Sequence, residues 1–350
     1  MASRNKVLAA SCHCRSVQFT ITLPTDSLPL KVHLCHCSIC RHTHGTLCTF
    51  HAGLPSGIEP QFIAPSSLQK LTGYQHATSL STRYFCSTCG CQIGDQIHED
   101  GSWVISNAIF DANKADHGIW KFATHLYPDS TRDGGLSALV PTVDNHHLEL
   151  INDTKDSSQP IEDTLPMDGN STTELLAQCH CGGVSFTIAR PKAEYIASPA
   201  SQNWLHPQDK RKWLACMDVC DDCRLVNGTH VIGWTFVPLD HISPRPSSNL
   251  LIGSAKAYRS TPDVLRTFCG TCGATVFYNC ADRPEIVDVG VGLLRAPEGV
   301  MAENWVLWRA GRVSWAENGL RYHAGFCHGL IEGMKQWGAE RDQPQDFVIL

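Results

Sequence analysis

The sequence lacks an excess of positive charge and lacks any long apolar run. Its 28 lysines and arginines are outnumbered by 34 aspartates and glutamates, and the formal charge of −6 disfavours nucleic acid or an anionic membrane as partner. No segment approaches the roughly 20 apolar residues of a membrane span, and the apolar run in MASRNKVLAASCHC is too short for a secretory signal. We therefore expect a soluble protein of the cytoplasm, with the nucleus as an alternative.

Long amphipathic helical patterns are also lacking, which argues against a helical protein. Short runs rich in β-branched and aromatic residues take their place, such as VQFTITL, VSFTIA, VIGWTFV and ATVFYN. The 27 glycines and 19 prolines separate these runs at short intervals. The pattern predicts a mainly β protein of small antiparallel sheets, which commonly need a metal to supplement a shallow core.

Cysteine is abundant, with 18 residues in the chain. Because a reducing compartment does not maintain structural disulfides, metal binding is the natural explanation for the clustered cysteines. Scattered cysteines such as Cys48, Cys280 and Cys327 instead read as small buried side chains.

The chain repeats itself. The segment CHCRSVQFTI from Cys12 matches CHCGGVSFTI from Cys179, at an offset of 167 residues. The segment CSICRHTHGT from Cys37 matches CDDCRLVNGT from Cys220 at an offset of 183, and RYFCSTCGCQI matches RTFCGTCGATV at that same offset. The repeats predict two tandem copies of one domain.

The domain boundaries follow from composition and from the change of offset. A stretch rich in Asp, Ser, Thr and Pro, NDTKDSSQPIEDTLPMDGNSTT, is typical of a linker. The larger second offset requires 16 additional residues in the second copy. We predict a first domain at 1–151, a polar linker at 152–173, and a second domain at 174–350 with an insertion within 189–215.

Paired cysteines two or three positions apart suit tetrahedral zinc, because one tight turn can supply two ligands. Each copy contains two such pairs, far apart in the sequence. The predicted structural sites are Cys12, Cys14, Cys86 and Cys89 in the first copy, and Cys179, Cys181, Cys269 and Cys272 in the second. We expect His13 and His180, which lie between paired cysteines, to have packing or surface roles, with metal binding as the alternative.

Three further cysteines, Cys35, Cys37 and Cys40, form the cluster LCHCSIC without an equally regular fourth. Three thiolates would leave zinc an open position, as in catalytic sites, where an incoming thiol would become a nucleophile. The alternative is that Cys48, Cys91, His42 or His44 closes the site and makes it structural.

The second copy departs from this pattern, because the position equivalent to Cys35 is Asp218. A metal there would take Cys220 and Cys223 together with either the Asp218 carboxylate or, by a local shift, the Cys216 thiolate. A third possibility is that this site holds no metal.

The order CxC, CxCxxC and CxxC, with CR before a glycine and FC..CG around the last pair, resembles the glutathione-dependent formaldehyde-activating enzyme family, which includes centromere protein V. The second copy resembles it also through TFCGTCGATVFYN, VDVGVGLL and AENWVLWRAGRVSWAENG. The resemblance implies two β-tent domains, each with a four-cysteine structural zinc and a three-cysteine second zinc.

The resemblance also implies an activity, the joining of glutathione and formaldehyde to S-(hydroxymethyl)glutathione, which is carbon-sulfur lyase chemistry in reverse. Cys35, Cys37 and Cys40 would hold the catalytic zinc. The partners would be a small thiol and a small carbonyl compound. Arg41 and Arg224, which follow the clusters, bind a substrate carboxylate or else make structural contacts.

A different class of function is a non-catalytic pair of zinc domains that binds a partner through DKRKW and nearby Trp204. The overall negative charge disfavours nucleic acid as that partner. Duplication within one chain also suggests an intramolecular pseudo-dimer.

Overall fold

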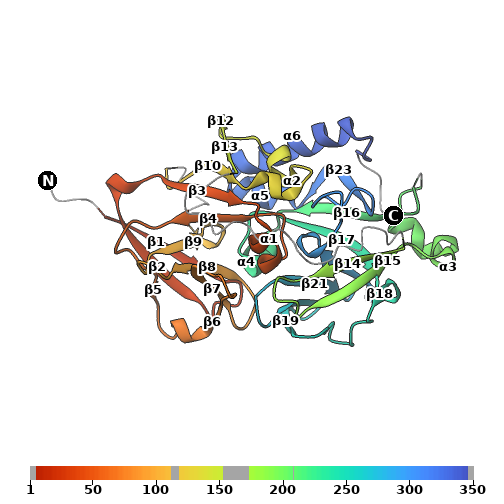
Figure 1. The fold of residues 1–350 in the computed structure, drawn as a ribbon, viewed down its shortest axis with the longest axis horizontal. Helices are drawn as coiled ribbons and strands as arrows, with labels where there is room; N and C mark the ends of the chain where they lie inside the picture. The colour runs from red at the N-terminus through yellow and green to blue at the C-terminus, as the bar shows by residue number, and fades with distance from the viewer. Residues whose placement is uncertain (1–4, 112–117, 153–172, 208, 346–350) are drawn as a thin grey trace.

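The computed structural model of the chain describes residues 5–111, 118–152, 173–207 and 209–345. Strands predominate, which confirms the mainly β class. The strands of the first half and those of the second half form two groups that lie side by side (Figure 1). None of the described helices combines the length and the apolar character needed to cross a lipid bilayer.

The first half contains a three-stranded and an eight-stranded sheet. Buried and exposed positions alternate along β2, where Phe19, Ile21 and Leu23 face the core. The small sheet has the order β1 (Asn5–Ser11), β2 (Gln18–Pro24) and β5 (Gln61–Phe62). The large sheet has the order β13 (Glu149–Ile151), β10 (Trp120–Leu126), β3 (Leu30–Cys35), β4 (Thr49–Gly53), β9 (Trp103–Ser106), β8 (Gln92–Ile97), β7 (Ser81–Cys86) and β6 (Leu71–Tyr74).

The second half repeats this arrangement. Its small sheet has the order β14 (Glu174–Gln178), β15 (Ser185–Ala189) and β18 (Ile242–Ser243). Its large sheet has the order β19 (Ala255–Thr261), β20 (Val264–Cys269), β21 (Thr275–Cys280), β22 (Ile286–Gly290), β17 (Ile232–Pro238), β16 (Trp213–Asp218) and β23 (Val306–Ser314). When this order is read in reverse, from β23 to β19, it matches the order from β10 to β6 in the first half, and only β13 has no counterpart. Duplication of one domain predicts this match.

The large sheets are mixed rather than purely antiparallel. The strand that leads into each cysteine cluster pairs in parallel with a later strand, β3 with β10 and β16 with β23. A short two-stranded sheet of β11 (Thr142–Val143) and β12 (His146–His147) also occurs. The expectation of antiparallel pairing therefore holds for most strand pairs but not for β3 with β10, β16 with β23 or β10 with β13.

The two copies meet through equivalent turns. Helices α1 (Ser38–His44) and α4 (Asp221–Asn227) each end at a glycine with left-handed backbone, Gly45 (φ 72°) and Gly228 (φ 68°). A Cβ at Gly45 would collide with the Thr275 carbonyl of β21, and one at Gly228 with the Gln92 carbonyl of β8. Glycine is thus required both to end the helix and to let the copies approach.

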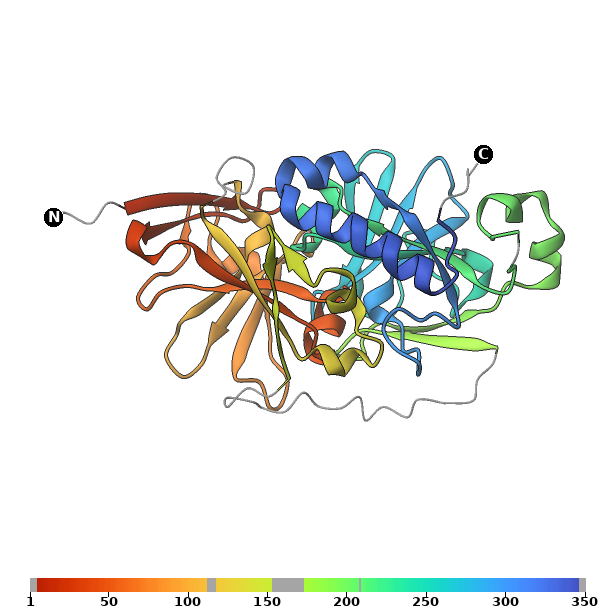
Figure 2. The same ribbon diagram turned by 90° about the horizontal axis from the view of Figure 1, so that it is seen from above.

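The absence of long helices is a prediction that the structure corrects. Helix α6 (Ala324–Glu340) has 17 residues; it lies in blue along the top of the molecule in Figure 1 and across the face seen in Figure 2. Its glycines lower helix propensity, but at Gly333 a Cβ would collide with the Leu139 carbonyl of α2 (Gly135–Leu139) in the first half. Its buried apolar side chains are Phe326, Cys327, Leu330, Met334 and Trp337.

The predicted insertion within 189–215 contains α3 (Ala193–Ala197) and a 3-10 turn at Pro199–Asn203. Trp213, the tryptophan of DKRKW, begins β16 and is 1% exposed, and its Nε1 donates a hydrogen bond to the Ala189 carbonyl at 3.0 Å. This aromatic side chain is therefore part of the core and does not face a partner. The predicted linker at 152–173 lies outside the described residues except at its two ends, so the domain boundaries stay a prediction.

The contact between the copies can be tested at Gly228. Gly228→Ala is expected to lose roughly 1–2 kcal/mol of stability through left-handed backbone strain, and more through the collision with Gln92. Gly57→Ala is the matched control, because Gly57 has φ 77° but open space around it. Denaturant unfolding followed by circular dichroism measures both, and equal losses would argue against the close contact.

Candidate metal centres

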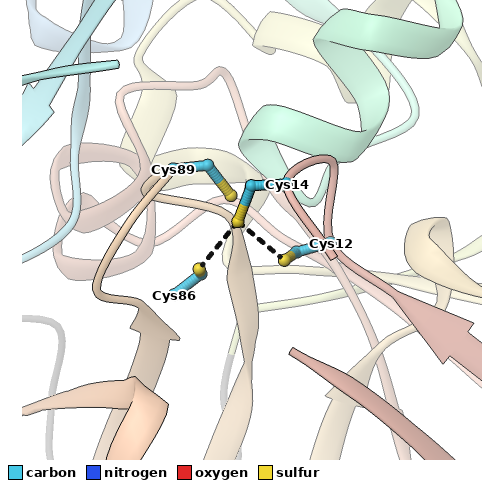
Figure 3. Close-up of side chains that lie close together, drawn as sticks. All are labelled: Cys12, Cys14, Cys86 and Cys89. Carbon is cyan, nitrogen blue, oxygen red and sulfur yellow. Dashed lines mark hydrogen bonds between the residues drawn. The ribbon is translucent and has the colours of Figure 1, made fainter. Parts of the chain in front are cut away.

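Four cysteines of the first copy converge on one point (Figure 3). Cys12 and Cys14 lie on the turn after β1, while Cys86 ends β7 and Cys89 follows on the next turn. The Sγ atom of Cys14 lies 3.5 Å from that of Cys12 and 3.6 Å from that of Cys86. Four sulfurs at about 2.3 Å from a tetrahedral zinc would lie about 3.8 Å apart, so this donor set fits zinc.

The second copy builds the same group from equivalent elements. Cys179 and Cys181 follow β14, and Cys269 and Cys272 lie at the end of β20. The Sγ atom of Cys181 lies 3.5 Å from those of both Cys179 and Cys269. In each copy all four sulfurs lie within 4.8 Å of one another, so each group can hold one zinc ion with no position left open.

The loop that carries each first cysteine pair also contacts the other copy. The Nδ1 atom of His13 lies 2.7 Å from the hydroxyl of Tyr258 on β19, and Nδ1 of His180 lies 2.7 Å from the hydroxyl of Tyr74 on β6. The backbone N–H of His13 donates to a carbonyl of α4, and that of His180 to a carbonyl of α1. These histidines therefore have the packing role assigned to them, and the packing is between copies.

The three-cysteine group lies where β3 ends and α1 begins. Cys35 is the last residue of β3, and Cys37 is the N-cap of α1, where its sulfur accepts a hydrogen bond from the Cys40 N–H at 3.4 Å. The Sγ atoms of Cys35 and Cys37 are 3.6 Å apart, and all three sulfurs lie within 4.8 Å of one another. A strand end and a helix start thus bring together the three cysteines that the sequence singled out.

No fourth ligand atom joins this group within the part of the chain that the structure describes. His42 and His44 are two of the residues considered for that role. Nδ1 of His42 lies 2.8 Å from the Gly292 carbonyl, and Nδ1 of His44 lies 3.1 Å from the Thr43 hydroxyl. Burial lowers the pKa of His44 to about 3. The other two candidates, Cys48 and Cys91, are buried, and burial raises the pKa of each thiol.

The second copy brings Asp218, Cys220 and Cys223 together within the same 4.8 Å limit. Asp218 ends β16 and accepts a hydrogen bond from the Cys220 N–H at 2.8 Å, and Cys220 is the N-cap of α4. Cys216, the alternative ligand, lies outside the group and accepts a hydrogen bond from the Ser314 hydroxyl at 3.5 Å. The carboxylate, not the Cys216 thiol, is therefore positioned with the two cysteines.

The family model described as glutathione-dependent formaldehyde-activating enzyme matches residues 7–129 and 207–309, well over half of the chain. The chain belongs to this family. The two matched regions are consistent with two tandem copies, and the description links the family to glutathione and formaldehyde. The first region contains both cysteine groups of the first copy, whereas the second begins after Cys181. Comparison with curated proteins finds no match.

The sequence analysis assigned no role to Arg83 and Arg266, although they begin the matched motifs RYFC and RTFC. The Nη1 atom of Arg266 donates to the Cys223 sulfur at 3.6 Å, and Nε of Arg83 lies 3.8 Å from Asp95. Burial lowers the pKa of Arg83, but the negative charges of Asp95 and Cys40 raise it by more. Each copy of this family member thus has a guanidinium, largely buried in Arg83 and buried in Arg266, that offsets the negative charge of its cluster.

Arg41 and Arg224 were predicted to bind a substrate carboxylate or to make structural contacts. Both are 4% exposed. The Nε atom of Arg41 donates to the His36 carbonyl at 2.8 Å, while Arg224 donates to the Ala108 carbonyl and lies over the ring of Tyr322. These contacts favour the structural role.

The four-thiol assignment can be tested in the first copy. Cys89→Ser is expected to lower the zinc content by about one equivalent and to destabilise the chain by several kcal/mol, because structural zinc binding contributes to folding. Cys91→Ser is the matched control, since Cys91 is equally buried but outside the group. Elemental analysis and thermal unfolding measure both, and retained zinc in Cys89→Ser would contradict the assignment.

The role of the buried arginines can be tested separately. Arg83→Met is expected to weaken zinc retention about 10- to 100-fold, as is usual when a group next to metal ligands is removed. Competition with a chromophoric chelator measures the affinity. Arg259→Met, at an exposed arginine of β19, is the control and is expected to change nothing. Equal zinc retention in both variants would show that Arg83 has no such role.

Proposed function

We propose that the chain is a zinc-dependent enzyme that joins a thiol such as glutathione to formaldehyde or another small carbonyl compound, or cleaves the adduct. Carbon-sulfur lyase chemistry would take place at Cys35, Cys37 and Cys40. Family membership supports the substrate class. The observation that carries the assignment is a group of three thiols that no fourth ligand atom joins among the described residues, since an incomplete ligand set is typical of catalytic zinc.

Zinc bound by these thiols would supply positive charge that favours the thiolate form of a substrate and polarises a carbonyl. In the synthetic direction the substrate thiol loses its proton, its sulfur bonds to the carbonyl carbon, and the carbonyl oxygen gains a proton. The reverse direction breaks the carbon-sulfur bond and returns the proton. The three cysteines orient the reactants, and the Arg83 guanidinium limits the build-up of negative charge beside them.

Polar side chains stand close to this cluster. The rings of His44 and His51 have centroids 5.5 Å apart, and Asp95 lies beside Arg83. Burial raises the pKa of Asp95 and lowers the pKa of His44. The nearby Cys40 raises both pKa values, so it adds to the effect of burial at Asp95 and opposes it at His44. A neutral His44 can donate and accept hydrogen bonds, so these groups suit a small polar substrate and the proton that moves during its reaction.

The two copies would act as an intramolecular pseudo-dimer. Support comes from the reciprocal contacts of His13 with Tyr258 and of His180 with Tyr74. The loop that carries Cys12 and Cys14 thereby contacts the second copy, and the loop that carries Cys179 and Cys181 contacts the first copy. The site in each copy therefore depends on an intact chain.

Equivalent substitutions in the two copies test the proposed function. Cys37→Ser is expected to lower the formation of S-(hydroxymethyl)glutathione, above the spontaneous rate, at least about 100-fold, because it removes a metal ligand. Nuclear magnetic resonance of the adduct follows the reaction.

Cys220→Ser, at the equivalent position, is the matched control and is expected to keep most of the rate. Circular dichroism checks that both variants are folded, and elemental analysis counts their zinc. A Cys37→Ser protein that has lost about one zinc and keeps its full rate contradicts the proposal.

A further inference from the structure

The surroundings of the two incomplete clusters differ in a consistent way. Cys35 pairs with Thr49 across β3 and β4, and Asp218 pairs with Ile232 across β16 and β17, so residues 183 positions apart are equivalent there. By this equivalence Cys35, His51, Gly53 and Asp95 of the first copy correspond to Asp218, Trp234, Phe236 and Tyr278 of the second. The second copy therefore has a carboxylate in place of a thiol, and aromatic rings in place of polar or small residues.

These aromatic residues line a cavity of about 340 Å³ that reaches Asp218, Cys220 and Cys223. Trp234 and Phe236 come from β17, and Tyr278 comes from β21. The cavity is within the size range of small-molecule sites and far larger than a carbonyl compound of two heavy atoms requires. Its walls therefore fit a ligand with a sizeable flat body.

Trp315 also lines the cavity and is 58% exposed. It follows β23 with a left-handed backbone (φ 58°), just as Tyr127 follows β10 with φ 56° in the first copy. Tyr127 packs against the three-cysteine group. Each copy therefore places an aromatic side chain beside its cluster at the same point of the fold.

The two guanidinium groups that line the cavity already have anionic or polar partners. Arg283 makes two hydrogen bonds to Asp288, at 2.6 and 2.8 Å. Arg266 donates to Cys223 at 3.6 Å and lies 4.7 Å from the ring centroid of Tyr278. Because these charges are compensated, the walls favour an apolar ligand body over a polyanionic one.

We propose that Asp218, Cys220 and Cys223 form a second metal centre that binds a thiol with a flat apolar substituent, such as an arylalkyl thiol. The ligand sulfur would join one carboxylate and two thiolates, and the flat group would lie in the aromatic cavity. The thiol as anchor rests on the proposed function, whereas the preference for a flat apolar group rests on the cavity alone.

The test uses the full chain with Cys37→Ser, loaded with Co²⁺, and with benzyl mercaptan and ethanethiol as probes. A thiol that binds cobalt changes the sulfur-to-cobalt charge-transfer absorption, so binding is measured without turnover. We expect benzyl mercaptan to bind at least about tenfold more tightly than ethanethiol. The double variant Cys37→Ser/Cys220→Ser, which also lacks a ligand of the second centre, is expected to show no change on adding either thiol.

Substitution of Trp315 tests the cavity wall without removing a core side chain, because this side chain is mostly exposed. Trp315→Ala in the Cys37→Ser chain is expected to weaken benzyl mercaptan binding about threefold to tenfold and to leave ethanethiol binding unchanged. Trp315→Tyr, which retains an aromatic ring as at Tyr127, is expected to keep most of the preference.

Four results would each overturn the proposal: no spectral change with either thiol, equal affinities, a preference that Trp315→Ala leaves intact, or a response that persists in the double variant. The first cluster is disabled in all of these measurements. A failure here is therefore distinct from a failure of the proposed function, which is measured by the turnover of the Cys37→Ser chain.

Discussion

The convergence of four thiols is the constraint on which the architecture of each copy depends. Cys12 and Cys14 follow a strand of the small sheet, whereas Cys86 and Cys89 lie at the end of a strand of the large sheet. A metal held by all four would join the small sheet to the large sheet, as metals often do in small β domains. The same loop carries His13, which reaches the other copy. One local site thus contributes to the domain and to the contact between domains.

Duplication within one chain gives two clusters that share a backbone arrangement but not a chemical environment. The first has three sulfur donors and polar neighbours such as His44 and Asp95. The second has a carboxylate, Asp218, and an aromatic cavity. Carboxylate oxygen is a harder donor than thiolate sulfur, so the two sets differ in the metals and substrates they favour. A common fold therefore does not imply a common substrate.

The cysteine groups could be predicted because their spacing is local and occurs twice. The pairing of Cys12 with Cys86, which are distant in sequence, followed from the recurrence of both motifs in the second copy. Helix α6 was missed because its glycines lower helix propensity, and the close approach of the first copy at Gly333 is a tertiary contact that the sequence does not reveal. Arg83 and Arg266 were visible in the repeated motifs, but nothing in their spacing indicated that they would meet a thiolate cluster across a sheet.

The sequence by itself determined the mainly β character, the duplication and the members of the two four-cysteine groups, because these follow from composition, repetition and short-range spacing. Only the tertiary structure shows that Asp218, and not Cys216, lies with Cys220 and Cys223, since this depends on which side chain the end of β16 directs toward α4. It also decided that Arg41 and Arg224 are buried and that aromatic rings line a cavity beside the second cluster. These features depend on strands and helices from distant parts of the chain, and such contacts form only when the sheets pack together.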